Sequence, residues 1–280
     1  MNPFNFQAKL QETFTPLRDV EILHLRARPS STLPRSFVID SSRPTTEQLL
    51  PPFKELILDN YQWGYTKQTV STLFNWTQIT LLELHNIALR AFLRSIRPED
   101  FVTLQTLIIS DCKPTSEGGR FHVAMLLHKL FASIKCLRRV AFRATDPAKA
   151  CTSLLNNHHN QSIYELDLRK YNWHHPQFNE REYLSIIVQY FPKITDLTMD
   201  LPNTNWGGTE ICFSHLIRCR NLRRLTIIGP LAYVEVEGIV KNVETDPSLI
   251  AAPLLRYLRR NKASKKFARN VCVSGSLLDT

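Results

Sequence analysis

An apolar pattern recurs eight times along this chain of 280 residues. In each instance apolar residues stand at the first, fourth and sixth positions, as in Ile163-Tyr-Glu-Leu-Asp-Leu168. This alternation is typical of a strand that turns Leu166 and Leu168 to one face and Glu165, Asp167 and Arg169 to the other. The pattern starts, at steps of 25 to 33 residues, at Val20, Phe53, Ile79, Leu104, Leu137, Ile163, Ile194 and Leu222. Such steps are typical of a solenoid built from strand–helix units, with an ordinary open α/β sheet as the alternative.

Three of these segments resemble leucine-rich repeats. They read Leu-Arg-Arg-Val-Ala-Phe at 137–142, Ile-Tyr-Glu-Leu-Asp-Leu at 163–168 and Leu-Arg-Arg-Leu-Thr-Ile at 222–227. The long, uneven period resembles the irregular repeats of fungal F-box/leucine-rich-repeat proteins. The resemblance implies an α/β solenoid, a horseshoe of about eight irregular strand–helix repeats with a parallel concave sheet. Leucine-rich repeats usually carry Asn or Cys three residues after the last apolar strand residue, and here only Cys112 fills that position.

The sequence predicts four regions along the chain. Residues 1–19 form an N-terminal cap or the remnant of a repeat, because exposed solenoid ends need a cap. Residues 20–246 form the solenoid, 247–262 a capping helix, and 263–280 a basic, disordered tail. An F-box is longer than the 19 residues before Val20, so we expect no F-box there.

Helical periodicity and helix boundary signals place helices in most gaps between the strands. The clearest helix covers 120–134, and the Glu117-Gly-Gly119 segment before it reads as a loop. The other expected helices cover 69–76, 88–96, 147–155, 180–190, 210–217, 234–243 and 253–260.

The net charge is +10, and most of it lies near the C-terminus. From Pro253 onward there are seven basic residues against one acid, Asp279. The basic residues are Arg256, Arg259, Arg260, Lys262, Lys265, Lys266 and Arg269. Six cysteines without a secretory signal predict reduced thiols in the cytoplasm or nucleus. No segment approaches the roughly 20 apolar residues of a membrane span.

The sequence predicts no enzyme, no cofactor and no metal. It has no glycine-rich phosphate loop, no Gly-x-Ser-x-Gly elbow and no His-Glu-x-x-His motif. The pairs His158-His159 and His174-His175 are the most metal-like feature, but neither has a Cys or an acid at standard zinc spacing. We interpret them as ordinary loop histidines.

Polar strand residues on the concave face are the predicted binding site. The resemblance implies that equivalent positions of successive strands line up into one surface. The predicted residues are Arg26, Glu55, Asp59, Glu83, His85, Arg139, Arg143, Glu165, Asp167, Arg169, Asp196, Asp200 and Arg224. The alternative is a merely solvated sheet face. Tyr61 and Trp63 follow a strand end, where they either anchor a partner or pack in the turn.

These charges alternate in sign, which favours a protein ligand over a polyanion, because a polyanion would meet acidic rows. We therefore expect a non-enzymatic interaction scaffold whose protein ligand the sequence does not identify. The family resemblance adds substrate recognition for a cullin–RING ubiquitin ligase, with a Skp-type adaptor as a further partner. The alternative is a nuclear or nucleic-acid-associated factor that acts through the basic tail.

Overall fold

The computed structural model describes residues 20–26, 50, 52–61, 63–112, 117–144, 162–170, 187, 189–200, 216, 218, 219, 221–229, 232–236, 239–243 and 271–275. The chain divides into two compact units. The N-terminal unit consists of Met1–Ala144 and Thr152–His159, and the C-terminal unit consists of Thr145–Cys151 and Asn160–Thr280. Each unit is described here by itself.

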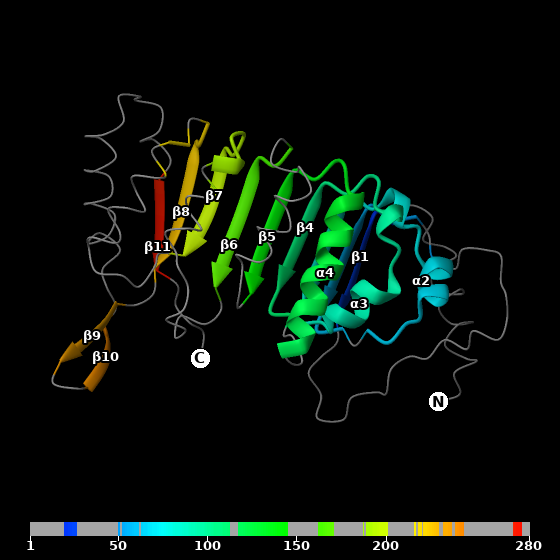
Figure 1. The fold of residues 1–280 in the computed structure, drawn as a ribbon, viewed down its shortest axis with the longest axis horizontal. Helices are drawn as coiled ribbons and strands as arrows, with labels where there is room; N and C mark the ends of the chain where they lie inside the picture. Colours follow the sequence, from blue (N-terminus) through cyan, green and yellow to red (C-terminus); the bar gives the residue numbers. More distant parts are fainter. Residues whose placement is uncertain are drawn as a thin grey trace. The chain divides into compact units, whose positions relative to one another are not determined.

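The described part of the N-terminal unit holds five parallel strands that adjoin one another in chain order (Figure 1). They are β1 (Ile22–Arg26), β2 (Glu55–Asp59), β3 (Leu81–His85), β4 (Thr106–Ser110) and β5 (Arg139–Ala144). The registers align the expected apolar positions into two rows, Leu23 to Val140 and Leu25 to Phe142. From β2 to β5 the side chains of both rows are almost fully buried. The burial of each such side chain adds roughly 1.5–3 kcal/mol to the free energy of unfolding.

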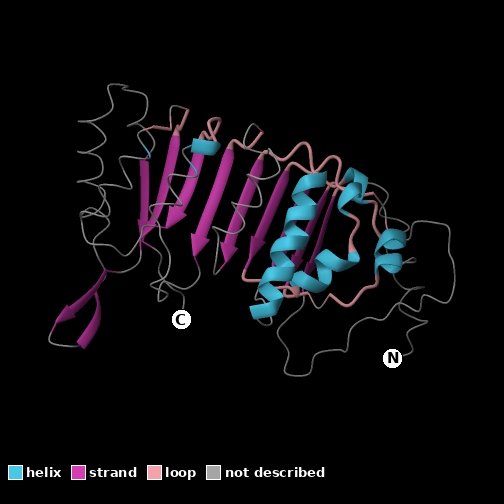
Figure 2. Cartoon of the chain, viewed as in Figure 1, coloured by secondary structure: helices cyan, strands magenta, loops and turns pink. Residues whose placement is uncertain are grey.

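Helices lie over one face of these strands (Figures 1 and 2). They are α2 (Lys67–Leu73), α3 (Leu89–Ser95) and α4 (Glu117–Ser133), with 3-10 turns η1 (Trp76–Gln78) and η2 (Pro98–Asp100). All three helices were expected from the sequence. The loop predicted at 117–119 is wrong, because α4 already begins at Glu117. Glycine weakens a helix mainly in its interior, so two glycines in the first turn are tolerated.

The described part of the C-terminal unit holds four further parallel strands, in the order β6, β7, β8, β11. Their bounds are β6 (Glu165–Lys170), β7 (Asp196–Asp200), β8 (Arg224–Gly229) and β11 (Val271–Gly275). The disordered tail predicted for 263–280 is therefore wrong at Val271–Gly275. Val271 and Val273 show the alternation of a strand. The basic residues that precede them favoured the interpretation as a disordered tail.

The helix predicted over 234–243 is also wrong. Strands β9 (Ala232–Val236) and β10 (Ile239–Val243) pair antiparallel there, with Val236 opposite Ile239. Five β-branched residues within twelve positions favour strands, and the two residues between the strands include Gly238, a frequent hairpin signal.

The predicted fold class is confirmed as α/β with an open main sheet of parallel strands, to which the antiparallel pair β9 and β10 does not belong. Several predictions lie outside the described residues: the cap at 1–19, helix 147–155, the capping helix at 247–262 and the basic residues Arg256 to Arg269. The same is true of the four paired histidines. In the described ranges, no helix has both the length and the apolar character needed to cross a membrane.

Candidate functional site

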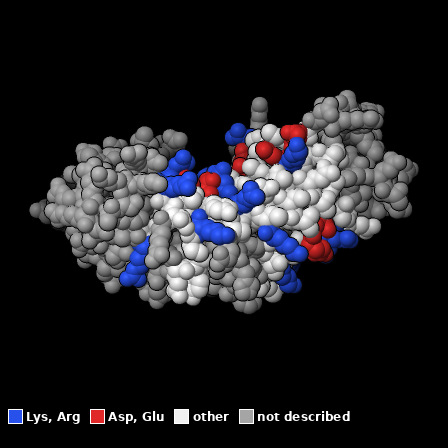
Figure 3. Space-filling view, turned by 90° about the horizontal axis from the view of Figure 1, so that it is seen from above, with Lys and Arg blue, Asp and Glu red and all other residues white. Residues whose placement is uncertain are grey.

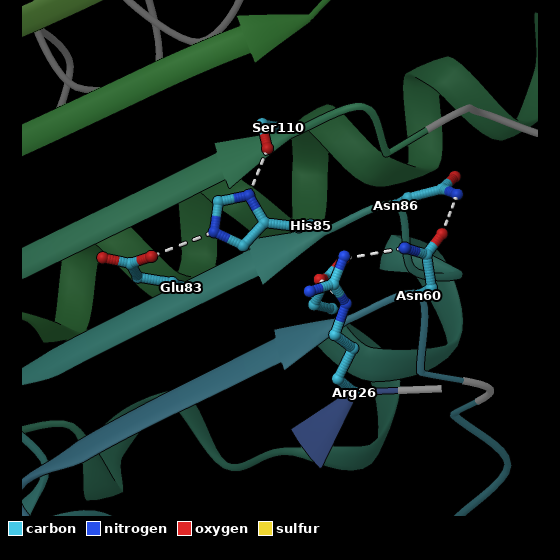
Figure 4. Close-up of polar contacts among 7 residues, drawn as sticks. Arg26, Asn60, Glu83, His85, Asn86 and Ser110 are labelled. Carbon is cyan, nitrogen blue, oxygen red and sulfur yellow. Dashed lines mark hydrogen bonds and ion pairs between the residues drawn. The ribbon is translucent and has the colours of Figure 1, made fainter. Parts of the chain in front are cut away.

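The strand face opposite the buried leucine rows is named the open face here. In the N-terminal unit the registers arrange it as three rows that run across β1 to β5. Figure 4 shows side chains of the open face, with the helices on the far side of the strands. From the N-terminal to the C-terminal ends of the strands, the rows are Ile22/Glu55/Leu81/Thr106/Arg139, His24/Ile57/Glu83/Ile108/Ala141 and Arg26/Asp59/His85/Ser110/Arg143.

The predicted alignment of polar strand positions is therefore observed within this unit. Arg26, Asp59, His85 and Arg143 share the third row, whereas Glu83 lies in the middle row. Burial increases along the open face toward β5. Ile22 on β1 is 53% exposed, whereas Ile108 on β4 and Ala141 on β5 are buried.

A chain of polar contacts connects the C-terminal ends of β1, β2 and β3 (Figure 4). Arg26 Nε lies 3.0 Å from Asp59 Oδ2, and Asn60 Nδ2 donates to Asp59 Oδ1 at 2.8 Å. Asn86 Nδ2 then donates to Asn60 Oδ1. Since the Arg26 side chain is 70% exposed, its ion pair with Asp59 adds at most about 1 kcal/mol to the free energy of unfolding.

A second chain of contacts fixes the His85 ring between its neighbours (Figure 4). Nε2 lies 2.9 Å from Glu83 Oε2, and Nδ1 is hydrogen-bonded to Ser110 Oγ on the next strand. A serine, a histidine and a carboxylate in contact resemble the groups of a hydrolytic triad. However, Ser110 is only 2% exposed, so its hydroxyl is not placed to attack a substrate. The contacts instead hold the imidazole of His85 between Glu83 on β3 and Ser110 on β4.

The turns after β2, β3 and β4 share one backbone geometry. Asn60, Asn86 and Asp111 have positive φ values of 53°, 48° and 57°. Asn and Asp tolerate this left-handed conformation better than most residues. Each residue donates its backbone N–H to a carbonyl in the last two residues of the following strand, at His85, Ser110 and Arg143, over 2.9 to 3.0 Å. The leucine-rich-repeat pattern places Asn or Cys one position later, so it did not predict these residues.

Cys112 directly follows Asp111 and occupies the position at which leucine-rich repeats usually carry Asn or Cys. Its Sγ lies 3.5 Å from the carbonyl oxygen of Leu84. Burial raises the pKa of the thiol to about 11. The thiol is therefore protonated at neutral pH and acts as a small buried group rather than as a nucleophile.

The aromatic residues after β2 pack in the turn. Trp63 is buried, and its Nε1 donates to Ser95 Oγ at 2.7 Å. Its ring centroid lies 4.8 Å from that of Phe92. Tyr61 and Tyr65 are hydrogen-bonded through their hydroxyl groups, and burial raises the pKa of both. Trp63 is therefore part of the core and does not anchor a partner.

In the C-terminal unit, Glu165, Asp196 and Arg224 lie in register on the open face. Arg224 Nε is 3.4 Å from Asp196 Oδ1. Asp167 accepts from Arg169 Nε at 2.8 Å and from another guanidinium nitrogen at 2.9 Å. The expectation that Asp167 is exposed is wrong, because only 5% of it is accessible. Alternation assigns a face to a residue but does not say what covers that face. The Asp200 side chain lies outside the described residues.

Charges of both signs occur together on the described surface (Figure 3). Arg26 pairs with Asp59, Asp167 with Arg169, and Asp196 with Arg224. Among the described residues, no group of three or more His, Cys, Asp or Glu side chains could hold a metal ion. The arrangement offers hydrogen-bond donors and acceptors in ordered rows, which suits recognition.

No protein-family model matches this chain, and no curated protein matches it.

Proposed function

We propose that this protein is a non-enzymatic interaction scaffold that binds a protein partner on the open face of its parallel strands. The observation that carries the proposal is the contrast between the two faces. One face has fully buried apolar rows under helices, whereas the other presents polar side chains held in register by strand pairing. A surface whose backbone is held by strand pairing needs little reorganisation on binding.

The sign of the charges favours a protein over a polyanion as the partner. Acidic and basic side chains both occur on the open face of each unit, for example Asp59 beside Arg26 and Asp196 beside Arg224. A polyanion gains from a continuous basic surface and is repelled by acidic rows. A folded protein surface can match both signs, which gives specificity.

The strand order supports binding rather than catalysis at a sheet crevice. Open α/β sheets usually bind small ligands where the strand order reverses, at the carboxyl ends of the strands. From β1 to β5 each strand adds to the same side of its predecessor, so the order does not reverse there. We therefore propose no catalytic residue, cofactor or metal.

At a finer level, we propose that the parallel strands belong to a leucine-rich-repeat horseshoe whose open face is concave. The sequence resemblance to fungal F-box/leucine-rich-repeat proteins then suggests substrate recognition for a cullin–RING ubiquitin ligase in the cytoplasm or nucleus. A Skp-type adaptor is the second partner in that case. This step rests on the resemblance alone.

The test is affinity purification of the tagged full chain, with mass spectrometry, in three forms. Wild type is compared with the double variant Arg26→Glu/Arg224→Glu, which reverses exposed open-face charges, and with Lys129→Glu, an exposed α4 residue on the helix-bearing side. A partner retained by wild type and Lys129→Glu but lost from the double variant supports the proposal. Equal recovery from all three forms contradicts it.

The same purification tests the finer proposal. A Skp-type adaptor and a cullin in the eluate support the ligase role. Recovery of a different partner without the adaptor and the cullin supports the role as an interaction scaffold and contradicts the ligase role.

A further inference from the structure

We infer that the part of the open face formed by β1, β2 and β3 receives a basic side chain of the partner, with the Glu55 carboxylate as its counter-ion. The inference rests on the proposed function and names the chemistry of the partner at one place. It follows from the charge, the accessible apolar surface and the contacts of this part of the face.

The charge here has one sign. The open-face positions of β2, β3 and β4 include three carboxylates, Glu55, Asp59 and Glu83, and no Lys or Arg. Basic residues lie only on the flanking strands, as Arg26 on β1 and as Arg139 and Arg143 on β5. A partner with a cation over β2 and β3 is therefore favoured electrostatically, and a partner shifted onto the flanking strands meets like charge.

Accessible apolar surface lies at the same place. Ile22 and Leu81 are the register neighbours of Glu55 on either side, and Ile57 is next on the same face of β2. Ile22 is 53% exposed, and Ile57 and Leu81 are partly exposed. Adjacent strands lie about 4.8 Å apart, so the three side chains border the carboxylate closely.

The contacts distinguish Glu55 from the other two acids. Asp59 is occupied by Arg26 and Asn60, and Glu83 by His85. Within the described ranges, the partly buried Glu55 side chain has no hydrogen-bond or ion-pair partner. A carboxylate bordered by aliphatic groups matches a Lys or Arg, whose methylene groups cover the apolar neighbours while the charged end reaches the carboxylate.

The size of this patch limits its role. Three strands span roughly 10 Å, and five residues along β2 span roughly 13 Å. A stable interface buries about 800 Å² on each partner, which is much larger. The patch is therefore an anchor point for one basic residue with an aliphatic neighbour, inside a wider contact.

The experiment selects peptides from a phage-displayed random 12-residue library against the purified full chain. Each enriched peptide is synthesised and measured by fluorescence anisotropy against wild type, Glu55→Gln, Ile22→Ser and the control Glu99→Gln, an exposed acid in η2. We expect an enriched Lys or Arg beside an aliphatic residue. Affinity should fall roughly tenfold with Glu55→Gln, fall with Ile22→Ser, and change less than about twofold with Glu99→Gln.

A charge swap completes the test. Glu55→Lys should abolish binding of the basic peptide, and a peptide with Glu in place of the basic residue should restore it. Matching thermal unfolding of all variants excludes a loss of fold as the cause.

Three results overturn the inference in distinguishable ways. Peptides that are insensitive to Glu55→Gln but sensitive to Ile22→Ser leave the open face as a binding surface and remove the role of Glu55. Failure to enrich any peptide overturns the inference. Peptides that bind every open-face variant as tightly as wild type also overturn it, and this last result contradicts the proposed function as well.

Discussion

Leu166 and Asp167 are neighbours on β6, and both are buried for different reasons. Leu166 is 0% exposed in the apolar row, whereas Asp167 is covered on the open face and bound by the Arg169 guanidinium. We expect Leu166→Asp to destabilise the fold by at least about 4 kcal/mol, because it buries a charge without a partner.

Asp167→Lys places a second cation beside Arg169. We expect a loss of about 2–4 kcal/mol, with a smaller loss for Asp167→Asn, which keeps one acceptor. Urea unfolding of the three variants measures both effects. An unchanged midpoint for Asp167→Lys would mean that the pair with Arg169 does not stabilise β6.

The Cys112 thiol gives a pH dependence of stability. Its pKa is about 11 in the folded chain, above the ordinary value of 9.0. The folded state therefore holds its proton at a pH where the unfolded state loses it. The free energy of unfolding should fall as the pH rises from about 9 to about 11, by about 2–3 kcal/mol. Since Tyr61 and Tyr65 titrate in the same direction, the measurement compares wild type with Cys112→Ala, which should show a shallower loss.

At the scale of elements, the turn after β3 tests the left-handed backbone. Asn86→Ala keeps a Cβ at positive φ but loses the short polar side chain that lets Asn adopt this conformation, and it removes the hydrogen bond to Asn60. We expect a loss of about 1–2 kcal/mol. Asn86→Gly removes the same hydrogen bond but accepts the backbone, so it should lose less. Thermal unfolding of both variants provides the comparison, and equal losses would show that backbone conformation is not the cause.

Strands and long helices were predictable because burial imposes a period on the sequence. The apolar positions of β2 to β7 match the buried rows, and the buried residues Leu127, Leu130 and Phe131 of α4 stand at helical spacing. The Asn60 and Asn86 turns carried a readable signal, an Asn after each of two strands 26 residues apart. Residues 234–243 were misread because a short apolar segment satisfies both helical and strand periods. For β11, pairing with β8 comes from distant contacts that no local pattern contains.

At the scale of the molecule, the open face and the basic tail make opposite predictions. Replacing the seven basic residues from Arg256 to Arg269 by Gln should leave the affinity for the protein partner within about twofold. If the nucleic-acid alternative holds, the wild-type chain should bind a single-stranded oligonucleotide tightly at 50 mM salt and far more weakly at 200 mM, and the substituted chain should not bind. Fluorescence anisotropy at the two salt concentrations separates these outcomes. Truncation is a poorer test, because it also deletes β11.

The place of β11 has a consequence for synthesis on the ribosome. The strand that pairs with β8 is separated from it by 41 residues of sequence. At about 5–20 residues per second, the backbone groups of the β8 edge wait at least roughly 2–8 s for their neighbour. During that time the nascent chain presents an unpaired parallel edge, which can capture another strand. A stop codon before Val271 would make that exposure permanent.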